Sequence, residues 1–163
     1  MVDRLLTTGD GLEVGDVLLR EPGFRITVVA PVAEHEEENE RSLVFRVDFD
    51  DWSLLATGDI GAETEAEIAA YWRGSDLLDV DVLAVPHHGS RRSSSPALLR
   101  AASPAAAVIQ VGKNIYGHPA PQTLDAYRRA GIPVFRCDRQ GAAAVRPGFR
   151  WRTMLKDRSA EPK

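Results

Sequence analysis

Apolar positions along the chain follow two different periods, and the change between them divides the predicted elements into two kinds. Up to residue 57 the apolar side chains alternate or form short runs between turns, which is typical of strands. We expect strands at 24–30, 42–49 and 52–57, with a hairpin joining the last two. Before residue 24 the pattern indicates only short strands broken by turns.

From residue 62 onward the pattern indicates helices alternating with strands. The expected helices are 62–72, 96–102 and 121–130, and the expected strands are 80–85, 106–111, 134–135 and 141–146. Glu63, Glu65 and Glu67 lie at the start of the first helix, where carboxylates suit the helix dipole. Together the two regions predict the α/β class.

Length and composition predict one compact domain. The chain has 163 residues, 44% of them hydrophobic, so we assign residues 1–155 to one domain and 156–163 to an exposed tail. No run of eighteen apolar residues occurs, and we expect the chain as given to be soluble. Cys137 is the only cysteine, which excludes an internal disulfide, and a buried structural thiol is its expected role.

Charge is divided unevenly along the chain. Residues 1–82 hold 20 Asp and Glu against 6 Lys and Arg, a charge of −14, whereas residues 83–163 hold 4 against 14, a charge of +10. A basic second half suits a polyanionic partner such as nucleic acid. Attraction between the two halves within the fold explains the division equally well. The acidic run at 34–40 includes His35, and a cation site there is the alternative to a solvated loop.

Three loops that each follow an apolar strand carry side chains of the kinds that bind metals. They are Thr57-Gly58-Asp59, Pro86-His87-His88-Gly89-Ser90 and Tyr116-Gly117-His118-Pro119. In open α/β sheets such strand ends meet at one edge, and carboxylate with imidazole suits zinc, manganese or iron. Taken alone, Asp59 is better explained as a cap for the following helix, and His118 is as well explained by a rigid turn.

The adjacent pair His87-His88 has no packing explanation and therefore favours function. The serines and arginines after it, including Ser90 and Arg91, offer donors for phosphate oxygens. Ser95 and Pro96 also form a standard helix start, and both interpretations can hold together.

Four segments together resemble, in order and spacing, the C-terminal metallo-β-lactamase-like domain of ComEC-type competence (DNA-uptake) proteins. They are Asn39-Glu40-Arg41-Ser42-Leu43-Val44, Leu54-Leu55-Ala56-Thr57-Gly58-Asp59-Ile60, Val85-Pro86-His87-His88-Gly89-Ser90 and Tyr116-Gly117-His118-Pro119. The resemblance covers roughly residues 8–147. It implies the C-terminal half of an αββα sandwich, which is a mixed sheet with helices packed on one face. It also implies an activity in the nucleolytic processing of incoming DNA.

The resemblance also implies roles for individual residues. Asp59 would bridge two divalent metals, zinc or manganese, and His88 or His87 would be a terminal ligand. His118 and Ser90 would lie at the reacting phosphate as catalytic residues, and Ser90, Arg91, His118 and Asn39 would contact the substrate. The implied reaction is metal-assisted hydrolysis of a phosphodiester.

The chain departs from the family pattern in one respect. The upstream His-x-Asp-x-Asp-His motif, which supplies most metal ligands in the family, is absent from the sequence. We therefore expect weak or no activity from the chain alone, with the missing N-terminal half as a partner in cis or trans, or a homodimer. The resemblance implies a membrane-attached full-length family, whereas we expect no membrane segment in the chain as given. The alternatives are a non-enzymatic phosphate- or DNA-binding module and a related metallo-hydrolase with another substrate.

Overall fold

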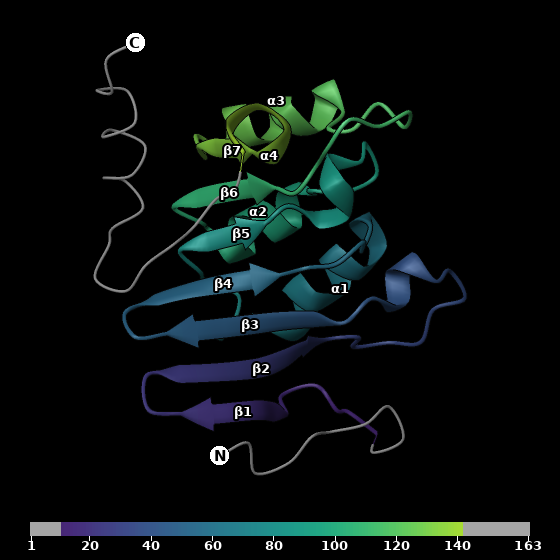
Figure 1. Ribbon diagram of the computed structural model, residues 1–163. Coiled ribbons are helices and arrows are strands. Elements are labelled where there is room, and N and C mark those ends of the chain that lie inside the picture. Colours follow the sequence, from purple (N-terminus) through teal and green to yellow (C-terminus); the bar gives the residue numbers. More distant parts are fainter. Residues whose placement is uncertain (1–10, 142–163) are drawn as a thin grey trace.

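Strands and helices follow one another in the predicted order within residues 11–141, which the computed structural model describes (Figure 1). The strands in this range are β1 (Val17–Glu21), β2 (Phe24–Ala30), β3 (Val44–Phe49), β4 (Trp52–Ala56), β5 (Val82–Ala84), β6 (Ala106–Ile109) and β7 (Val134–Arg136). The helices are α1 (Ala62–Tyr71), α2 (Pro96–Ala102), α3 (Pro121–Arg129) and α4 (Cys137–Gln140), with 3₁₀ turns η1 (Asn39–Arg41) and η2 (Pro86–Gly89).

All seven strands in the described range form one sheet, in the order in which they occur along the chain. Strands β1 to β4 pair antiparallel, and β4 to β7 pair parallel, with helices in the connections between the parallel strands. The predicted mixed α/β sheet is therefore confirmed. Because β4, β5 and β6 are parallel, the loops that follow them emerge at the same edge of the sheet.

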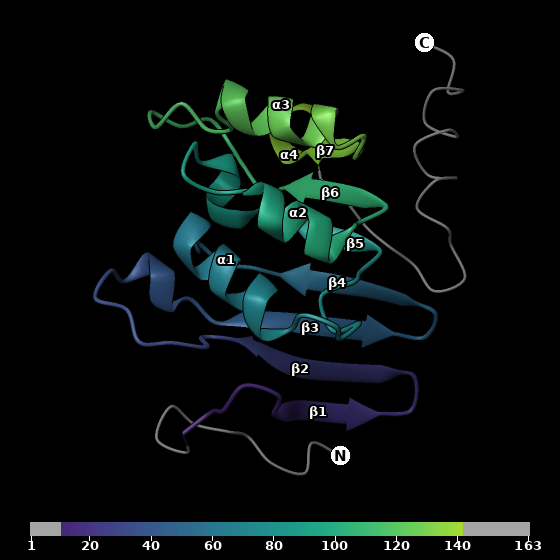
Figure 2. The ribbon, with the colours of Figure 1, turned by 180° about the vertical axis from the view of Figure 1, so that it is seen from behind.

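Helices α1, α2 and α3 cover one face of the sheet, as the two opposite views show (Figures 1 and 2). The core between the layers is apolar: Val44, Leu55, Leu83 and Ile109 of the sheet and Ile68 and Leu98 of the helices are all fully buried. Burial of apolar surface contributes about 25 cal/mol per Å² to the stability of the fold, and it is the main force that holds the helices and the sheet together.

The opposite face of the sheet is also apolar, and within residues 11–141 only the short helix α4 lies on it, at the β7 end (Figure 1). Cross-strand partners on this face are Phe45 with Ala56, Val47 with Leu54 and Phe49 with Trp52, and all of these side chains are half-buried. The alternation within 42–49 thus turns its apolar side away from the helices. Cys137 is half-buried against the apolar cluster at the β7 end of the same face.

Predicted and observed ends agree within two residues for the elements from β2 to β7. Helix α4 was not predicted, because a single turn is too short to show a helical period. The expected strand at 141–146, the domain boundary at 155 and the tail at 156–163 lie outside the described residues, apart from residue 141. No helix within 11–141 combines the length and the apolarity needed to cross a membrane.

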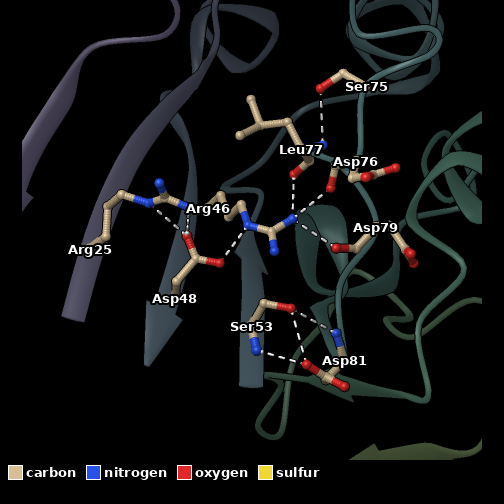
Figure 3. A network of polar contacts seen from close by, with 9 residues as sticks. All are labelled: Arg25, Arg46, Asp48, Ser53, Ser75, Asp76, Leu77, Asp79 and Asp81. Carbon is tan, nitrogen blue, oxygen red and sulfur yellow. Dashed lines mark hydrogen bonds and ion pairs between the residues drawn. The ribbon is translucent and has the colours of Figure 1, made fainter. Parts of the chain in front are cut away.

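Arg46 organises the polar end of the helix-covered face (Figure 3). Its Nη1 donates to the carbonyl oxygens of Asp76, Leu77 and Asp79, at 2.8, 2.9 and 2.7 Å, and its Nε donates to Asp48 at 2.7 Å. These bonds fasten the connection between α1 and β5 to the middle of β3. A polar residue on the covered face of β3 is therefore satisfied by the backbone of a loop.

Candidate functional site

The three candidate loops lie at one edge of the sheet and are hydrogen-bonded to one another through their main chains. The amide of His87 donates to the carbonyl oxygen of Gly58 at 3.0 Å, which ties the loop after β5 to the loop after β4. The amide of Ala120 donates to the carbonyl oxygen of Gly89 at 2.8 Å, which ties in the loop after β6. The predicted convergence of these loops is therefore observed.

The histidine pair has a strained backbone. His87 and His88 both have positive φ angles, 48° and 52°, within η2. Left-handed conformations cost non-glycine residues roughly 1–2 kcal/mol each, and such outliers gather at functional sites. Gly89 continues the turn at φ +82°, where a Cβ atom would lie 2.7 Å from that of Pro119, so only glycine fits between the two loops.

Asp59 and His88 face each other at the edge of the sheet. His88 Nε2 lies 3.7 Å from Asp59 Oδ1, and the two side chains are 51% and 43% exposed. His88 Nδ1 is 2.6 Å from the carbonyl oxygen of Gln110, which can only accept, so Nδ1 donates this hydrogen bond and Nε2 is the ring nitrogen directed at Asp59. That arrangement is the usual one for a metal-binding histidine, whose other nitrogen is held by a backbone carbonyl.

His118 completes a cluster of imidazoles at this edge. Its ring centroid is 5.7 Å from that of His87, with the planes at 70°. Burial, and then the neighbouring His87 and His88, lower the pKa of His118, while Asp59 opposes the shift. His118 is therefore neutral at neutral pH. Its Nδ1 is buried and has no hydrogen-bond partner among the described residues. Buried polar atoms are normally hydrogen-bonded, so this nitrogen is available to a ligand.

Asn114 holds the loop that carries His118. Its side-chain amide donates to the carbonyl oxygens of Gly112 and His118, at 2.9 and 2.8 Å, and its oxygen accepts from the amides of Tyr116 and His118, both at 3.1 Å. Tyr116 is 77% exposed and stacks on His118 with an interplanar angle of 24°. A rigid loop thus presents an aromatic ring to solvent beside the imidazoles.

Glu40, rather than Asp59, caps helix α1. The N-cap residue Gly61 makes no side-chain cap, and Oε2 of the buried Glu40 accepts from the amides of Gly61 and Thr64 at 3.1 and 3.2 Å. Burial would raise the pKa of Glu40, but the hydrogen bonds from Thr64 and Gly61 outweigh it and hold the pKa below its ordinary value. The capping explanation of Asp59 is therefore wrong, and its carboxylate is available to His88.

Ser90, Arg91 and Asn39 are placed differently from one another. Ser90 is only 5% exposed, and its Oγ accepts from the amide of Arg92 at 3.3 Å. The side chain of Ser90 therefore lies inside the loop, whereas Arg91 and Asn39 are exposed. Ser95 caps α2, as its sequence context indicated, with Oγ accepting from the amide of Leu98 at 3.3 Å.

Glu65 supports the segment that follows His87 and His88, and this role was not recognised from the sequence. This fully buried carboxylate accepts from the amides of Ser94 and Ser95, at 2.6 and 2.5 Å. Burial raises its pKa, and these two hydrogen bonds counteract the shift only in part. Ser94 Oγ lies 3.1 Å from the hydroxyl of Tyr127, so the network joins α1, the loop before α2, and α3.

The residues at the sheet edge fit a shared cation as part of a ligand set. Two ligands on a tetrahedral zinc, with bonds of 2.0–2.1 Å, are roughly 3.3 Å apart, close to the separation of Asp59 Oδ1 and His88 Nε2. Within residues 11–141, however, the one group of three ligand residues whose atoms all lie within 4.8 Å is His35, Glu63 and Glu67. The described part of the edge therefore supplies fewer ligands than a complete metal site needs.

Comparison with known proteins places the chain beside competence proteins, although no protein-family model matches it. It is 31% identical over 140 residues to ComE operon protein 3 of Bacillus subtilis, covering 85% of this chain and 17% of that protein. It is 37% identical over 107 residues to competence protein ComA of Neisseria gonorrhoeae, covering 65% and 15%, and 41% identical over 76 residues to recombination protein 2 of Haemophilus influenzae, covering 47% and 9%.

The class that these relatives define is that of the competence proteins. The chain belongs to the ComEC type within it, as a homologue of one segment, and the resemblance carried by the four motifs is confirmed. It spans less than a fifth of the length of each of these relatives.

Proposed function

We propose that this chain is part of a metal-dependent phosphodiesterase that acts on nucleic acid during DNA uptake. The observation that supports this most strongly is the Asp59–His88 pair, in which Nδ1 of His88 is hydrogen-bonded to the carbonyl oxygen of Gln110 and Nε2 faces Asp59. The names of the relatives support the link to competence.

Each residue of the cluster has a role in this proposal. Asp59 and His88 would hold a divalent metal, zinc or manganese, with His87 beside them. When bound, such a metal supplies Lewis acidity toward a phosphodiester and an activated water. The neutral imidazole of His118 is able to accept a proton at neutral pH. Arg91 is exposed next to the histidines and would attract the phosphate backbone. Ser90 would act through the shape of its loop, since its hydroxyl faces inward.

The remaining ligands would come from outside residues 11–141, and the open face of the sheet suggests how. Half-buried apolar side chains such as Phe45, Val47 and Leu54 form a continuous surface there. A surface of this kind favours an apolar partner layer, either a further segment of a longer polypeptide or a second copy of the chain. In either case the chain alone would be weakly active.

Cleavage assays under single-turnover conditions test the proposal. We expect slow cleavage of labelled DNA with Mn²⁺ or Zn²⁺, abolished by Asp59→Asn and by His88→Ala. The matched control is Asp51→Asn, at an exposed aspartate of the β3–β4 hairpin, which should cleave at the wild-type rate. Cleavage that is unaffected by Asp59→Asn would refute the assignment. Cleavage of a small chromogenic diester but not of DNA would favour a metallo-hydrolase with another substrate.

A non-enzymatic DNA-binding module is the second candidate, and the exposed ring of Tyr116 favours it. Stacking of a base on an aromatic side chain contributes about 1–3 kcal/mol, so Tyr116→Ala should weaken binding of single-stranded DNA roughly tenfold. Tyr116→Phe retains the ring and should bind as the wild type does. Salt-dependent binding without metal, together with no cleavage in any metal, would identify this function.

A further inference from the structure

A second cluster of metal-binding side chains lies away from the histidine loops, where the acidic run meets helix α1. His35 Nε2 lies 2.8 Å from Oε2 of Glu67 and 3.4 Å from Oγ1 of Thr64. One ligand atom from each of His35, Glu63 and Glu67 falls within 4.8 Å of the other two. The cluster shares no residue with the Asp59–His88 pair.

We propose that His35, Glu63 and Glu67 form a binding site for a divalent transition metal, with zinc as the best fit. Glu63 and Glu67 are four residues apart on α1 and therefore project from the same side of the helix. His35 reaches them from the loop between β2 and η1. An imidazole nitrogen with two carboxylate oxygens suits zinc, whereas magnesium and calcium prefer oxygen ligands alone.

The burial of His35 is an independent sign that the cluster is built around the imidazole. Glu34, Glu36 and Glu37 beside it are exposed, yet the side chain of His35 is only 8% exposed. The run thus turns its one imidazole inward, toward two carboxylates that would otherwise repel each other. Glu63 is exposed, which leaves the site open to solvent and gives this ligand the freedom to close on an ion.

A metal in this position would fasten the acidic loop to α1. The same loop continues into Glu40. The carboxylate of Glu40 accepts from the amides of Gly61 and Thr64 at the start of α1, and Gly61 is two residues after Asp59. Three protein ligands with a fourth position for water is a common zinc arrangement. Metal binding at His35 would therefore stabilise the loop from His35 to Glu40, which supports the turn at Asp59. This effect does not depend on the proposed phosphodiesterase activity.

Zinc titration of the full chain tests the site, with Asp59→Asn, His87→Ala and His88→Ala combined to remove the other ligands. In this background we expect one equivalent of Zn²⁺ to bind by calorimetry at pH 7.5, and the midpoint of thermal unfolding to rise with Zn²⁺. Glu63→Gln changes an exposed side chain and should not affect folding. Because loss of mere supporting partners weakens metal sites about 10–100-fold, loss of this direct ligand should weaken binding at least about tenfold.

His35→Ala should abolish the saturable binding, and Glu37→Gln, at an exposed residue of the same loop, should leave it unchanged. Absence of saturable binding in the background variant would overturn the proposal and identify the contact as a histidine–glutamate ion pair. Binding that survives both His35→Ala and Glu63→Gln would overturn it as well, since the ion would then lie elsewhere.

Discussion

Replacing Glu40 should destabilise the domain and disturb the candidate site together. In Glu40→Ala the amides of Gly61 and Thr64 lose the one oxygen that accepts from both, in a buried position. An unsatisfied buried donor costs about 1–3 kcal/mol. Allowing for some entry of water, we expect the free energy of unfolding to fall by about 3 kcal/mol, out of the roughly 5–15 kcal/mol of an ordinary domain. Glu40→Gln keeps an oxygen acceptor but loses its charge, and should cost about 1 kcal/mol.

Urea denaturation followed by tryptophan fluorescence measures these changes, with Glu38→Ala, an exposed neighbour, as the control. Since the pKa of Glu40 is lowered in the fold, the unfolded chain binds more protons at acid pH. The contribution of Glu40 is thus complete above its unfolded pKa, near 4.5, and is lost as the pH falls through the lower folded value. Glu40→Ala should lack this part of the acid dependence. If Glu40→Ala lowers the free energy of unfolding by less than about 0.5 kcal/mol, the range of ordinary surface substitutions, the capping role is refuted.

Three other changes test separate parts of the structure. Arg46→Met removes the hydrogen bonds to three loop carbonyls and should lower the free energy of unfolding by about 2 kcal/mol, measured by thermal or urea unfolding. The control Arg25→Met breaks an exposed ion pair and should lower it by less than about 1 kcal/mol. Equal losses in the two variants would contradict the anchoring role of Arg46. Glu65→Gln leaves one of two amides facing an NH₂ group and should cost about 2 kcal/mol at neutral pH. Because the folded pKa of Glu65 is raised, the wild type loses stability as the pH rises from near 4.5 through that value, and this slope should vanish in the variant. Because the folded pKa of His118 is lowered, stability should fall as the pH drops below about 6.5, and His118→Asn should abolish this dependence in pH-resolved thermal unfolding.

The sequence was informative where a metal-binding type of residue directly follows a strand that its apolar pattern predicts. Asp59, His87 and His118 each follow an apolar run, and the rule that parallel strand ends meet at one edge was enough to predict their convergence. The directions in which His87 and His88 point could not be predicted, because the directions of neighbouring residues in left-handed conformations follow no helical or strand period. The structure turns His88 to Asp59 and His87 to His118.

Carboxylates that support the site were hidden by their surroundings in the sequence. Glu40 belongs to an acidic run that is typical of a solvated loop, and Glu65 occupies a helix position that suits the dipole. Both are buried, because each accepts amide protons from a segment more than twenty residues away. Such pairings depend on tertiary packing, which a helical or strand period does not encode. The sequence signal that was present for Glu40 was its place in the Asn-Glu-Arg-Ser motif.

The position of these supporting groups explains why the Asp59–His88 pair is exposed and yet geometrically defined. Neither side chain is fixed by burial, since about half of each is open to solvent. Their relative position is instead set by main-chain bonds between the loops and by Glu40 behind the Asp59 turn. An open pair on a fixed backbone is suited to receive further ligands from another layer. For the proposed metal site, it follows that substitutions of supporting residues such as Glu40 should reduce metal affinity in a metal titration while leaving Asp59 and His88 in place.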